Sequence, residues 1–205
     1  MTPLLADESL LVVDKPAGLL AVPGRGEHKQ DCLWRRVREH WPDALVVHRL
    51  DMATSGLMLF ARGVEMQRRL SRAFASRQVD KRYLALVAGR MPAAQGRIEL
   101  PLAADWPQRP RQQVDRVHGK ASVTVWQALA FDEQRQVSRL MLQPLTGRTH
   151  QLRVHLAAIG HPILGDALYA PPVLQDGRLM LHAHALQFMH PLHGHVVQVR
   201  SEPPF

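Results

Sequence analysis

The sequence has a single cysteine, Cys32, in 205 residues. One cysteine excludes an intramolecular disulfide and a cysteine-rich zinc site, which is typical of proteins that stay in a reducing cytoplasm. The sequence also lacks an apolar run near the roughly 18 residues that span a bilayer, and its start, MTPLLADESLLVV, lacks the basic residues of a secretory signal. We therefore predict a soluble cytoplasmic protein that has no membrane contact and keeps Cys32 as a packed thiol.

Lysine and acidic residues are scarce. Only four of the 26 basic residues are lysines, so 22 are arginines, and the 18 acidic residues leave a net charge of +8. The resulting pI of about 10.7 indicates a polyanionic partner, nucleic acid first. Arginine binds phosphate through a flat, two-pronged donor and stacks on bases, so this bias favours nucleic-acid recognition. The alternative is that a GC-rich coding sequence uses arginine merely for surface charge.

The sequence has no repeat, no low-complexity tract and no Gly/Ser linker. Its length and its hydrophobic content of 46% are enough for one core, so we predict a single domain over residues 1–205. Runs of strand type dominate and alternate with few helices, which predicts an α+β domain. The predicted strands lie at residues 10–13, 44–47, 56–61, 81–89, 121–129, 137–145, 179–188 and 195–199.

Three helices are predicted from apolar spacing and end signals. Asp31 should cap a helix over Cys32–Trp41. A second helix, Val64–Gln78, places its arginines away from its apolar side, so it should present a basic face to solvent or RNA. The third helix, Thr149–Ile159, has Gly160 as its C-cap.

Two segments carry charged residues in unusual places. In HRLDMATSG, residues 48–56, a lone carboxylate, Asp51, sits in a loop between two apolar strands, two positions after Arg49. A loop held by buried strands is a common location for chemistry. In TGRTHQLRVH, Arg148 stands at the start of a predicted helix, where a cation opposes the helix dipole. Such a residue often belongs to a site, and Arg148 with the free backbone N–H groups would hold a phosphate or a carboxylate.

Together, HRLDMATSG, KRYLALVAG and TGRTHQLRVHLAAIGHPILGDALY resemble the motifs of the RluA family of RNA pseudouridine synthases. The first contains the family's HRLD-x-x-TSG and the third its TGR-x-HQLR-x-H, in the family's order. The resemblance runs from about Glu8 to the C-terminus. PAGLLAVPGRGEHK, HRLDMATSG and DWPQRPRQ are similar to one branch in particular, whose implied substrates are the anticodon loop of certain tRNAs and a loop of 23S rRNA.

The resemblance implies the pseudouridine synthase fold, a mixed, largely antiparallel sheet with flanking helices and a central active-site cleft. Because it begins almost at the first residue, we expect no separate S4-like RNA-binding domain, and the catalytic domain itself should choose the RNA. A monomer is the default expectation. No cofactor is expected, since the family's reaction only breaks the N-glycosidic bond of a uridine, turns the base and joins C5 to the ribose C1′.

The resemblance assigns three residues to catalysis. Asp51 matches the catalytic aspartate, which either attacks C1′ or removes a C2′ proton, and the sequence leaves both open. Without the motif, a turn aspartate that bonds its own backbone would be the better interpretation. Arg148 matches the arginine that pairs with this aspartate, and such a cation favours the ionised carboxylate. Tyr83 matches the tyrosine that packs on the base or assists loss of the C5 proton; stacking is the simpler role, because a phenol is a weak base at neutral pH.

Three further arginines lie within the motifs. Arg49 matches the arginine that fills the space left by the extruded uridine, with a surface salt bridge as the alternative. Arg62 and Arg153 are expected to contact phosphate or to play a structural role. The partners predicted from these residues are structured RNAs, namely a tRNA anticodon stem-loop and 23S rRNA.

Histidines near the C-terminus raise the alternative of a metal site. His182 and His184 share a predicted strand, and His190, His193 and His195 follow. A catalytic metal needs a third ligand and supporting contacts, and none is identifiable, so we expect no functional metal. Two other classes therefore compete with the isomerase. One is a non-catalytic basic RNA-binding or ribosome-assembly protein; the other is a metal-dependent nuclease, which needs several carboxylates where HRLD offers one beside an arginine.

Overall fold

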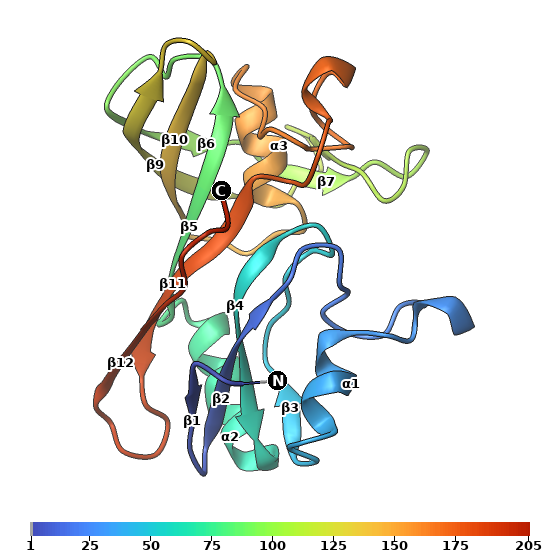
Figure 1. Ribbon diagram of the computed structural model, residues 1–205, viewed down its shortest axis with the longest axis vertical. Coiled ribbons are helices and arrows are strands. Elements are labelled where there is room, and N and C mark those ends of the chain that lie inside the picture. The colour runs from blue at the N-terminus through green and yellow to red at the C-terminus, as the bar shows by residue number, and fades with distance from the viewer. Residues whose placement is uncertain (1) are drawn as a thin grey trace. The chain divides into compact units, whose positions relative to one another are not determined.

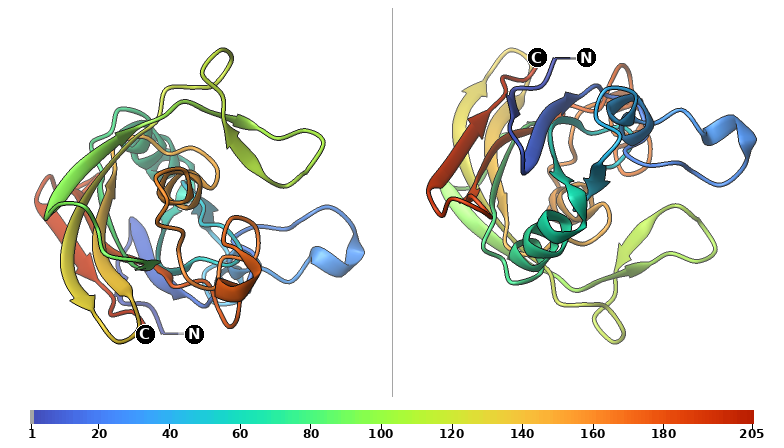
Figure 2. Two further views of the ribbon diagram at one scale, coloured as in Figure 1. Left: turned by 90° about the horizontal axis from the view of Figure 1, so that it is seen from above. Right: turned by 90° about the horizontal axis from the view of Figure 1, so that it is seen from below.

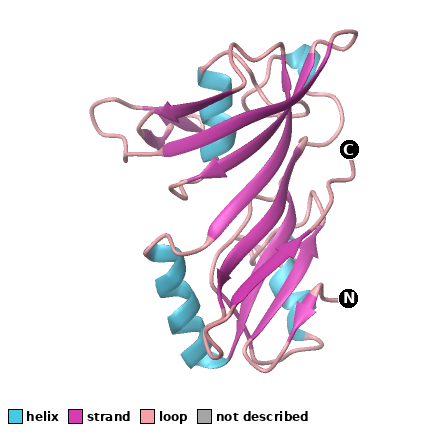
Figure 3. Ribbon diagram, turned by 90° about the vertical axis from the view of Figure 1, so that its left-hand side faces the viewer, coloured by secondary structure: helices cyan, strands magenta, loops and turns pink. Residues whose placement is uncertain are grey.

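A computed structural model describes residues 2–205, and the chain forms two compact units. Unit 1 comprises the chain up to Lys81 and the segment His182–Pro204, and unit 2 comprises Arg82–Leu181 with Phe205. Strands are more abundant than helices in both units (Figure 3). That the two units function as the single domain predicted from the sequence stays a prediction.

Unit 1 is built on a mixed sheet (Figure 1). Its strands follow the order β1-β2-β4-β11, with β3 paired to β4 and β12 to β11. The pairing of β4 with β11 is parallel, and the pairs β1–β2, β2–β4, β3–β4 and β11–β12 are antiparallel. The bounds are β1 (Leu5–Ala6), β2 (Leu10–Lys15), β3 (Ala44–Val46), β4 (Ser55–Arg62), β11 (Leu181–Met189) and β12 (Val196–Arg200).

Strands β2 and β4 are buried on both faces, which explains why LLVV and GLMLFA are continuous apolar runs rather than alternating ones. On one face, their side chains pack against Leu70 of helix α2 (Gly63–Ala75) and against β11 and β12. On the other face they pack against Leu33 and Val37 of helix α1 (Leu33–Arg38). A short 3₁₀ turn, Glu27–Lys29, precedes α1.

The first helix differs from the prediction. α1 covers Leu33–Arg38 instead of Cys32–Trp41. Asp31 does not cap it, because its carboxylate forms an ion pair with Arg36 over 2.6 Å while Cys32 occupies the N-cap position. Cys32 is buried, as predicted.

The second helix, α2, lies within three residues of the predicted bounds at each end. Its arginines Arg68, Arg69 and Arg72 are exposed, so the predicted basic face is confirmed. One of them, Arg69, forms an ion pair with Glu65 over 2.9 Å.

Unit 2 contains an antiparallel sheet in the order β5-β10-β9-β6. Helix α3 (Gln151–Ala158) packs against it, and a separate hairpin of β7 and β8 projects beside it (Figure 2, left). A 3₁₀ turn covers Pro172–Leu174. The bounds are β5 (Asp80–Ala88), β6 (Gln95–Glu99), β7 (Leu102–Ala104), β8 (Gln112–Val114), β9 (Val123–Asp132) and β10 (Val137–Pro144).

The predicted α+β class with a mixed, largely antiparallel sheet is confirmed. Strands β6, β7 and β8 were not predicted, because they are three to five residues long and mostly polar or partly exposed, so they carry no strong apolar pattern. Within residues 2–205, no helix is long and apolar enough to cross a membrane.

Candidate active site

The loop between β3 and β4 carries two of the predicted site residues. Asp51 lies in this loop, as predicted, and is partly buried, whereas Arg49 is exposed. The backbone N–H of Thr54 donates to the carbonyl of Asp51 over 3.1 Å, which closes a short turn directly after the carboxylate. Because β4 lies in the core of unit 1, the loop ends at a strand whose position is fixed.

His48 anchors the first half of this loop. Its Nε2 accepts the backbone N–H of Leu59 over 2.9 Å, and its ring stacks on Phe74 with the centroids 4.4 Å apart. An accepting Nε2 carries no proton, so the ring is neutral with its proton on Nδ1. Burial, with a smaller contribution from the charge of Lys81, lowers the pKa of His48 to about 3. The histidine of the HRLD motif is therefore an anchor rather than an acid or a base.

This shift predicts that the fold is sensitive to acid. The folded protein protonates His48 only near its lowered pKa of about 3, whereas the unfolded chain does so near the ordinary value of 6.5. As the pH decreases below about 6.5, the free energy of unfolding should therefore decrease, and this residue should contribute up to ~1.4 kcal/mol per pH unit. Urea unfolding measured at about pH 7.5 and about pH 5 tests this. His48→Gln keeps an acceptor near Nε2 but does not titrate, so it should lose less stability; equal losses in the two proteins would contradict the prediction.

Lys15 anchors the second half of the loop. This lysine is fully buried, and its Nζ donates to three backbone carbonyls over 2.9, 2.8 and 3.0 Å, the last being that of Met52. The N–H of Gly18 donates to the same Met52 carbonyl over 2.9 Å. Gly18 has φ of 83°, which glycine adopts without steric cost. Since Met52 follows Asp51 directly, the Lys-Pro-Ala-Gly turn holds the backbone next to the carboxylate.

The Thr-Ser-Gly end of the motif joins β4 to β11. Ser55 pairs with His182, and Gly56 pairs with Ala183, in parallel register. A Cβ at Gly56 would overlap the backbone of Ala183, and φ of 109° is strained for any other residue. The glycine of this motif therefore allows the two strands to approach closely at the point where the Asp51 loop ends.

Arg148 lies before helix α3 rather than within it. The helix starts at Gln151 and not at Thr149, because His150 adopts the left-handed conformation with φ of 53°. The backbone N–H of Arg148 donates to Oε1 of Gln151 over 3.1 Å. The prediction that free backbone N–H groups here bind an anion is therefore wrong for the Arg148 amide, because the Gln151 side chain already accepts its hydrogen bond. The Arg148 residue itself is exposed.

Gln151 determines the shape of the loop that carries Arg148, and the sequence did not single it out. It is 4% exposed, and its Oε1 also accepts the hydroxyl of Thr146 over 2.7 Å. Its Nε2 donates to the carbonyl of Val123 over 2.9 Å and to the hydroxyl of Thr124 over 3.0 Å. A buried amide whose donors and acceptor are all used holds one geometry, so Arg148 leaves from a defined backbone.

Tyr83 lies on β5, as predicted, partly buried and opposite Leu142 of β10. Asp51 and Arg49 belong to unit 1, whereas Tyr83 and Arg148 belong to unit 2. The assembly of these residues into one site therefore stays a prediction.

Arg62 and Arg153 hold parts of the protein together. Arg153 is buried and forms a two-pronged ion pair with Asp166 over 2.6 and 2.8 Å. The guanidinium of Arg62 contacts the carboxylate of Asp43 over 3.0 Å and the carbonyl of Asp7 over 3.0 Å. Of the two roles that the sequence left open for these arginines, their contacts match the structural one.

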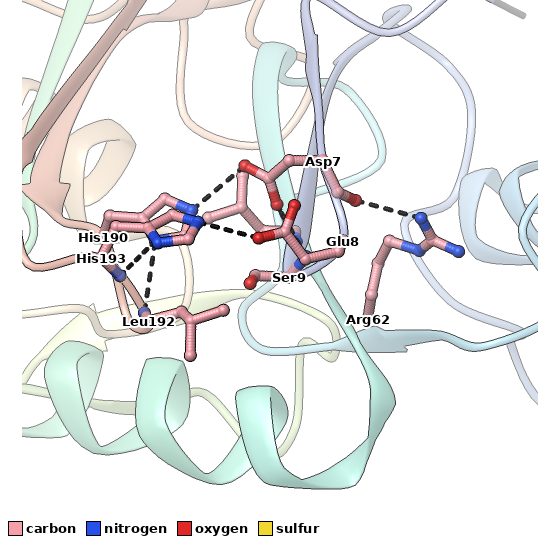
Figure 4. A network of polar contacts seen from close by, with 8 residues as sticks. Asp7, Glu8, Ser9, Arg62, His190, Leu192 and His193 are labelled. Carbon is pink, nitrogen blue, oxygen red and sulfur yellow. Dashed lines mark hydrogen bonds and ion pairs between the residues drawn. The ribbon is translucent and has the colours of Figure 1, made fainter.

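The histidines of the β11–β12 turn bind protein groups (Figure 4). Nε2 of His190 donates to the carboxylate of Asp7 over 3.1 Å, because its Nδ1 accepts the backbone N–H groups of Leu192 and His193. His193 contacts Glu8 over 2.8 Å. In the part of the chain that the structure describes, no group of three or more His, Cys, Asp or Glu side chains is arranged to hold a metal ion. These histidines fasten the turn to the β1–β2 connection.

Comparisons with known proteins agree with the motifs. Residues 9–158 match the family described as RNA pseudouridylate synthase. The dual-specificity RNA pseudouridine synthase RluA of Vibrio cholerae is 48% identical over 187 residues, which cover 90% of this chain and 76% of that protein. The protein of the same name from Escherichia coli K12 is 43% identical over 204 residues, 98% of this chain and 93% of that protein. The solved structure of human RNA pseudouridylate synthase domain containing 1 aligns with a TM-score of 0.81 at 30% identity, over 98% of this chain and 82% of that chain.

Proposed function

The chain belongs to the RNA pseudouridylate synthase family, and on this basis we propose that it converts specific uridines to pseudouridine in a tRNA anticodon stem-loop and in 23S rRNA. The chain is thus an RNA pseudouridine synthase, an isomerase. Relatives at 43% and 48% identity carry dual specificity in their names, which supports two RNA substrates. Both RNAs act in translation, so the proposal includes the cytoplasmic location predicted from the sequence.

The proposed reaction rearranges one nucleotide. The bond between N1 and C1′ breaks, the base turns, and a bond forms between C5 and C1′. A proton leaves C5 and a proton is taken up at N1, so atoms and electrons balance without an oxidant or a reductant. The protein must therefore supply a group that acts on the ribose, contacts that hold the turning base, and a surface that binds the RNA.

The observation that carries the proposal is the fixed loop of Asp51. The loop is held by His48 at its start, by Lys15 beside the carboxylate, and by Ser55 and Gly56 at its end. Either role of Asp51, attack on C1′ or removal of the C2′ proton, needs a carboxylate at a fixed distance from the ribose. A loop anchored at three places supplies such a carboxylate.

The other roles follow the motifs. We assign Arg148 as the cation that pairs with Asp51, and Tyr83 as the side chain that stacks on the base. Arg49, exposed two residues before Asp51, fills the place of the extruded uridine. In unit 1, the exposed arginines of α2 provide additional positive charge for the phosphate backbone.

The β7–β8 hairpin offers a surface for an RNA base. Trp106 is 67% exposed, and the guanidinium carbon of Arg109 lies 3.4 Å from the centroid of its ring. Exposed aromatic rings beside arginines are the usual platforms for bases of single-stranded RNA. We therefore assign Trp106 to RNA binding rather than to the chemical step.

Replacing Trp106 should weaken RNA binding without slowing the reaction. One lost base stack costs about 1–3 kcal/mol, so Trp106→Ala should raise the Kd about 5- to 150-fold. The rate at saturating RNA should stay within about twofold of wild type, because the residue acts on binding alone. Filter binding and single-turnover assays measure the two effects. Val173→Ala, at a position that is 84% exposed in the same unit, is the control and should bind normally; unchanged affinity of Trp106→Ala would refute the assignment.

The substrates can be identified directly. Unmodified transcripts of tRNA and 23S rRNA are incubated with the protein, and pseudouridine is mapped by carbodiimide modification and primer extension. The proposal predicts one modified uridine in the anticodon loop and one in 23S rRNA. Modification of only one RNA would contradict the dual specificity while leaving the enzyme class intact.

A further inference from the structure

A chain of hydrogen-bonded polar side chains leads away from the end of the Asp51 loop in unit 1. Nδ1 of His182 lies 2.8 Å from the hydroxyl of Ser55. Nε2 of the same ring lies 3.1 Å from the hydroxyl and 3.2 Å from the carbonyl of Ser201. The hydroxyl of Ser201 donates in turn to the carboxylate of Asp14 on β2. Ser55 and His182 are 3% and 1% exposed, so the bond between them is shielded from water, whereas Asp14 at the far end of the chain is exposed.

The donor and the acceptor of each hydrogen bond follow from the group at the far end, the Ser201 carbonyl. A carbonyl only accepts, so Nε2 of His182 carries the ring proton and donates to Ser201. Nδ1 is then without a proton and accepts the hydroxyl of Ser55. His182 is therefore held in one tautomer, and it fixes the orientation of the Ser55 hydroxyl.

Ser55 occupies a sensitive position. It is the first residue of β4, and it follows the turn in which Thr54 donates to Asp51. In the parallel ladder that joins β4 to β11, Ser55 pairs with His182 and Gly56 with Ala183. The side-chain bond from His182 adds a second link between the two strands at the place where the loop enters the sheet.

We propose that His182 is a positioning residue for Asp51, which it serves by accepting the hydroxyl of Ser55 and so fixing the end of the loop that carries the carboxylate. The role rests on the proposed function of Asp51 and includes no contact of His182 with RNA. Small displacements of a reacting group reduce rates strongly, and about 1 Å can cost 10²-fold. We expect loss of the Ser55 bond to lower kcat about 10-fold and to leave KM within about twofold.

Two variants distinguish the hydrogen bonds of the two ring nitrogens of His182. His182→Asn places an amide oxygen near the Nδ1 position, so it keeps the acceptor for Ser55 and loses the donor to Ser201. His182→Gln places an amide nitrogen near the Nε2 position, so it keeps the donor to Ser201 and loses the acceptor for Ser55. Each variant loses the buried hydrogen bonding of one ring nitrogen, and we expect similar decreases in thermal midpoint. A purely structural role therefore predicts the same kcat for both.

The proposal predicts different values of kcat for these variants. His182→Gln should lose about 10-fold in kcat, whereas His182→Asn should stay within about threefold of wild type. The kcat of Ser55→Ala should match that of His182→Gln. The double variant Ser55→Ala/His182→Gln should lose no more in kcat than either single variant, because both substitutions remove the same bond. Equal kcat values for the Asn and Gln variants, or wild-type kcat in both His182→Gln and Ser55→Ala, would overturn the proposal. If His182→Gln fails to fold, Ser55→Ala alone decides it.

His184 provides the matched control. It lies two residues along the same strand, and its Nδ1 donates to the same Ser201 carbonyl over 2.7 Å. His184→Asn should leave kcat unchanged, because the link to Ser55 is intact. The wild-type rate separates this inference from the proposed function. An inactive wild-type protein would contradict the function, whereas an active wild type with unaffected His182 and Ser55 variants would contradict only the positioning role.

Discussion

Asp51→Asn should abolish pseudouridine formation while the fold persists. The amide neither attacks C1′ nor removes a C2′ proton, so we expect the single-turnover rate to fall on the order of 10⁴-fold. The loop should keep its shape, because His48, Lys15 and Gly56 hold it through contacts that do not involve the carboxylate. Rates with saturating RNA and the thermal unfolding midpoint measure the two expectations.

The matched control for this variant is Asp176→Asn. It makes the same change of charge at an exposed position of unit 2 and should react at the wild-type rate. A rate for Asp51→Asn within about tenfold of wild type would show that the carboxylate is not essential and would contradict the assignment.

Arg148→Ala should have the second largest effect. If the guanidinium pairs with the carboxylate of Asp51, its loss should lower the single-turnover rate about 10³-fold, the upper end of the loss expected when one stabilising hydrogen-bond donor is removed from a site. RNA affinity should change much less, since one phosphate contact at most is lost. The fold should persist, because the backbone of the Arg148 loop is fixed by Gln151 and not by the exposed arginine.

Two further variants serve as controls for this result. Arg148→Lys keeps the charge but not the two-pronged donor, so it should recover part of the rate. Arg135→Ala removes an exposed arginine from the β9–β10 turn of the same unit and should be fully active. Wild-type rates in Arg148→Ala would show that this arginine does not support catalysis.

The sequence predicted the elements that surround the Asp51 loop, because those elements have strong local patterns. β3 and β4 are continuous apolar segments with the Asp51 loop between them, and α2 is a periodic apolar segment that follows β4. The start of α3 was predicted two residues too early. A local pattern does not show that His150 adopts the left-handed backbone conformation or that the Gln151 side chain accepts the backbone N–H of Arg148.

The anchors of the loop were not predicted, for a physical reason. Lys15 reads as a surface lysine in a turn, and its burial depends on a carbonyl 37 residues further along the chain. The bond between Ser55 and His182 joins residues 127 apart. Such contacts arise from tertiary packing, and composition or periodicity in one sequence contains no signal for them. For Arg62 and Arg153 the motif positions left a phosphate contact and a structural role open, and the partners that the structure shows are aspartates of the protein.

We propose that this chain isomerises uridine in both RNAs through Asp51. The most direct measurement is release of tritium from 5-tritiated uridine in a tRNA anticodon stem-loop and in a 23S rRNA fragment, with EDTA present, for wild type and Asp51→Asn. Tritium leaves because C5 exchanges its hydrogen for the bond to C1′. We expect release from both RNAs by the wild-type protein and none by the variant. Tight RNA binding without release from either RNA would contradict it and would identify a non-catalytic RNA-binding protein.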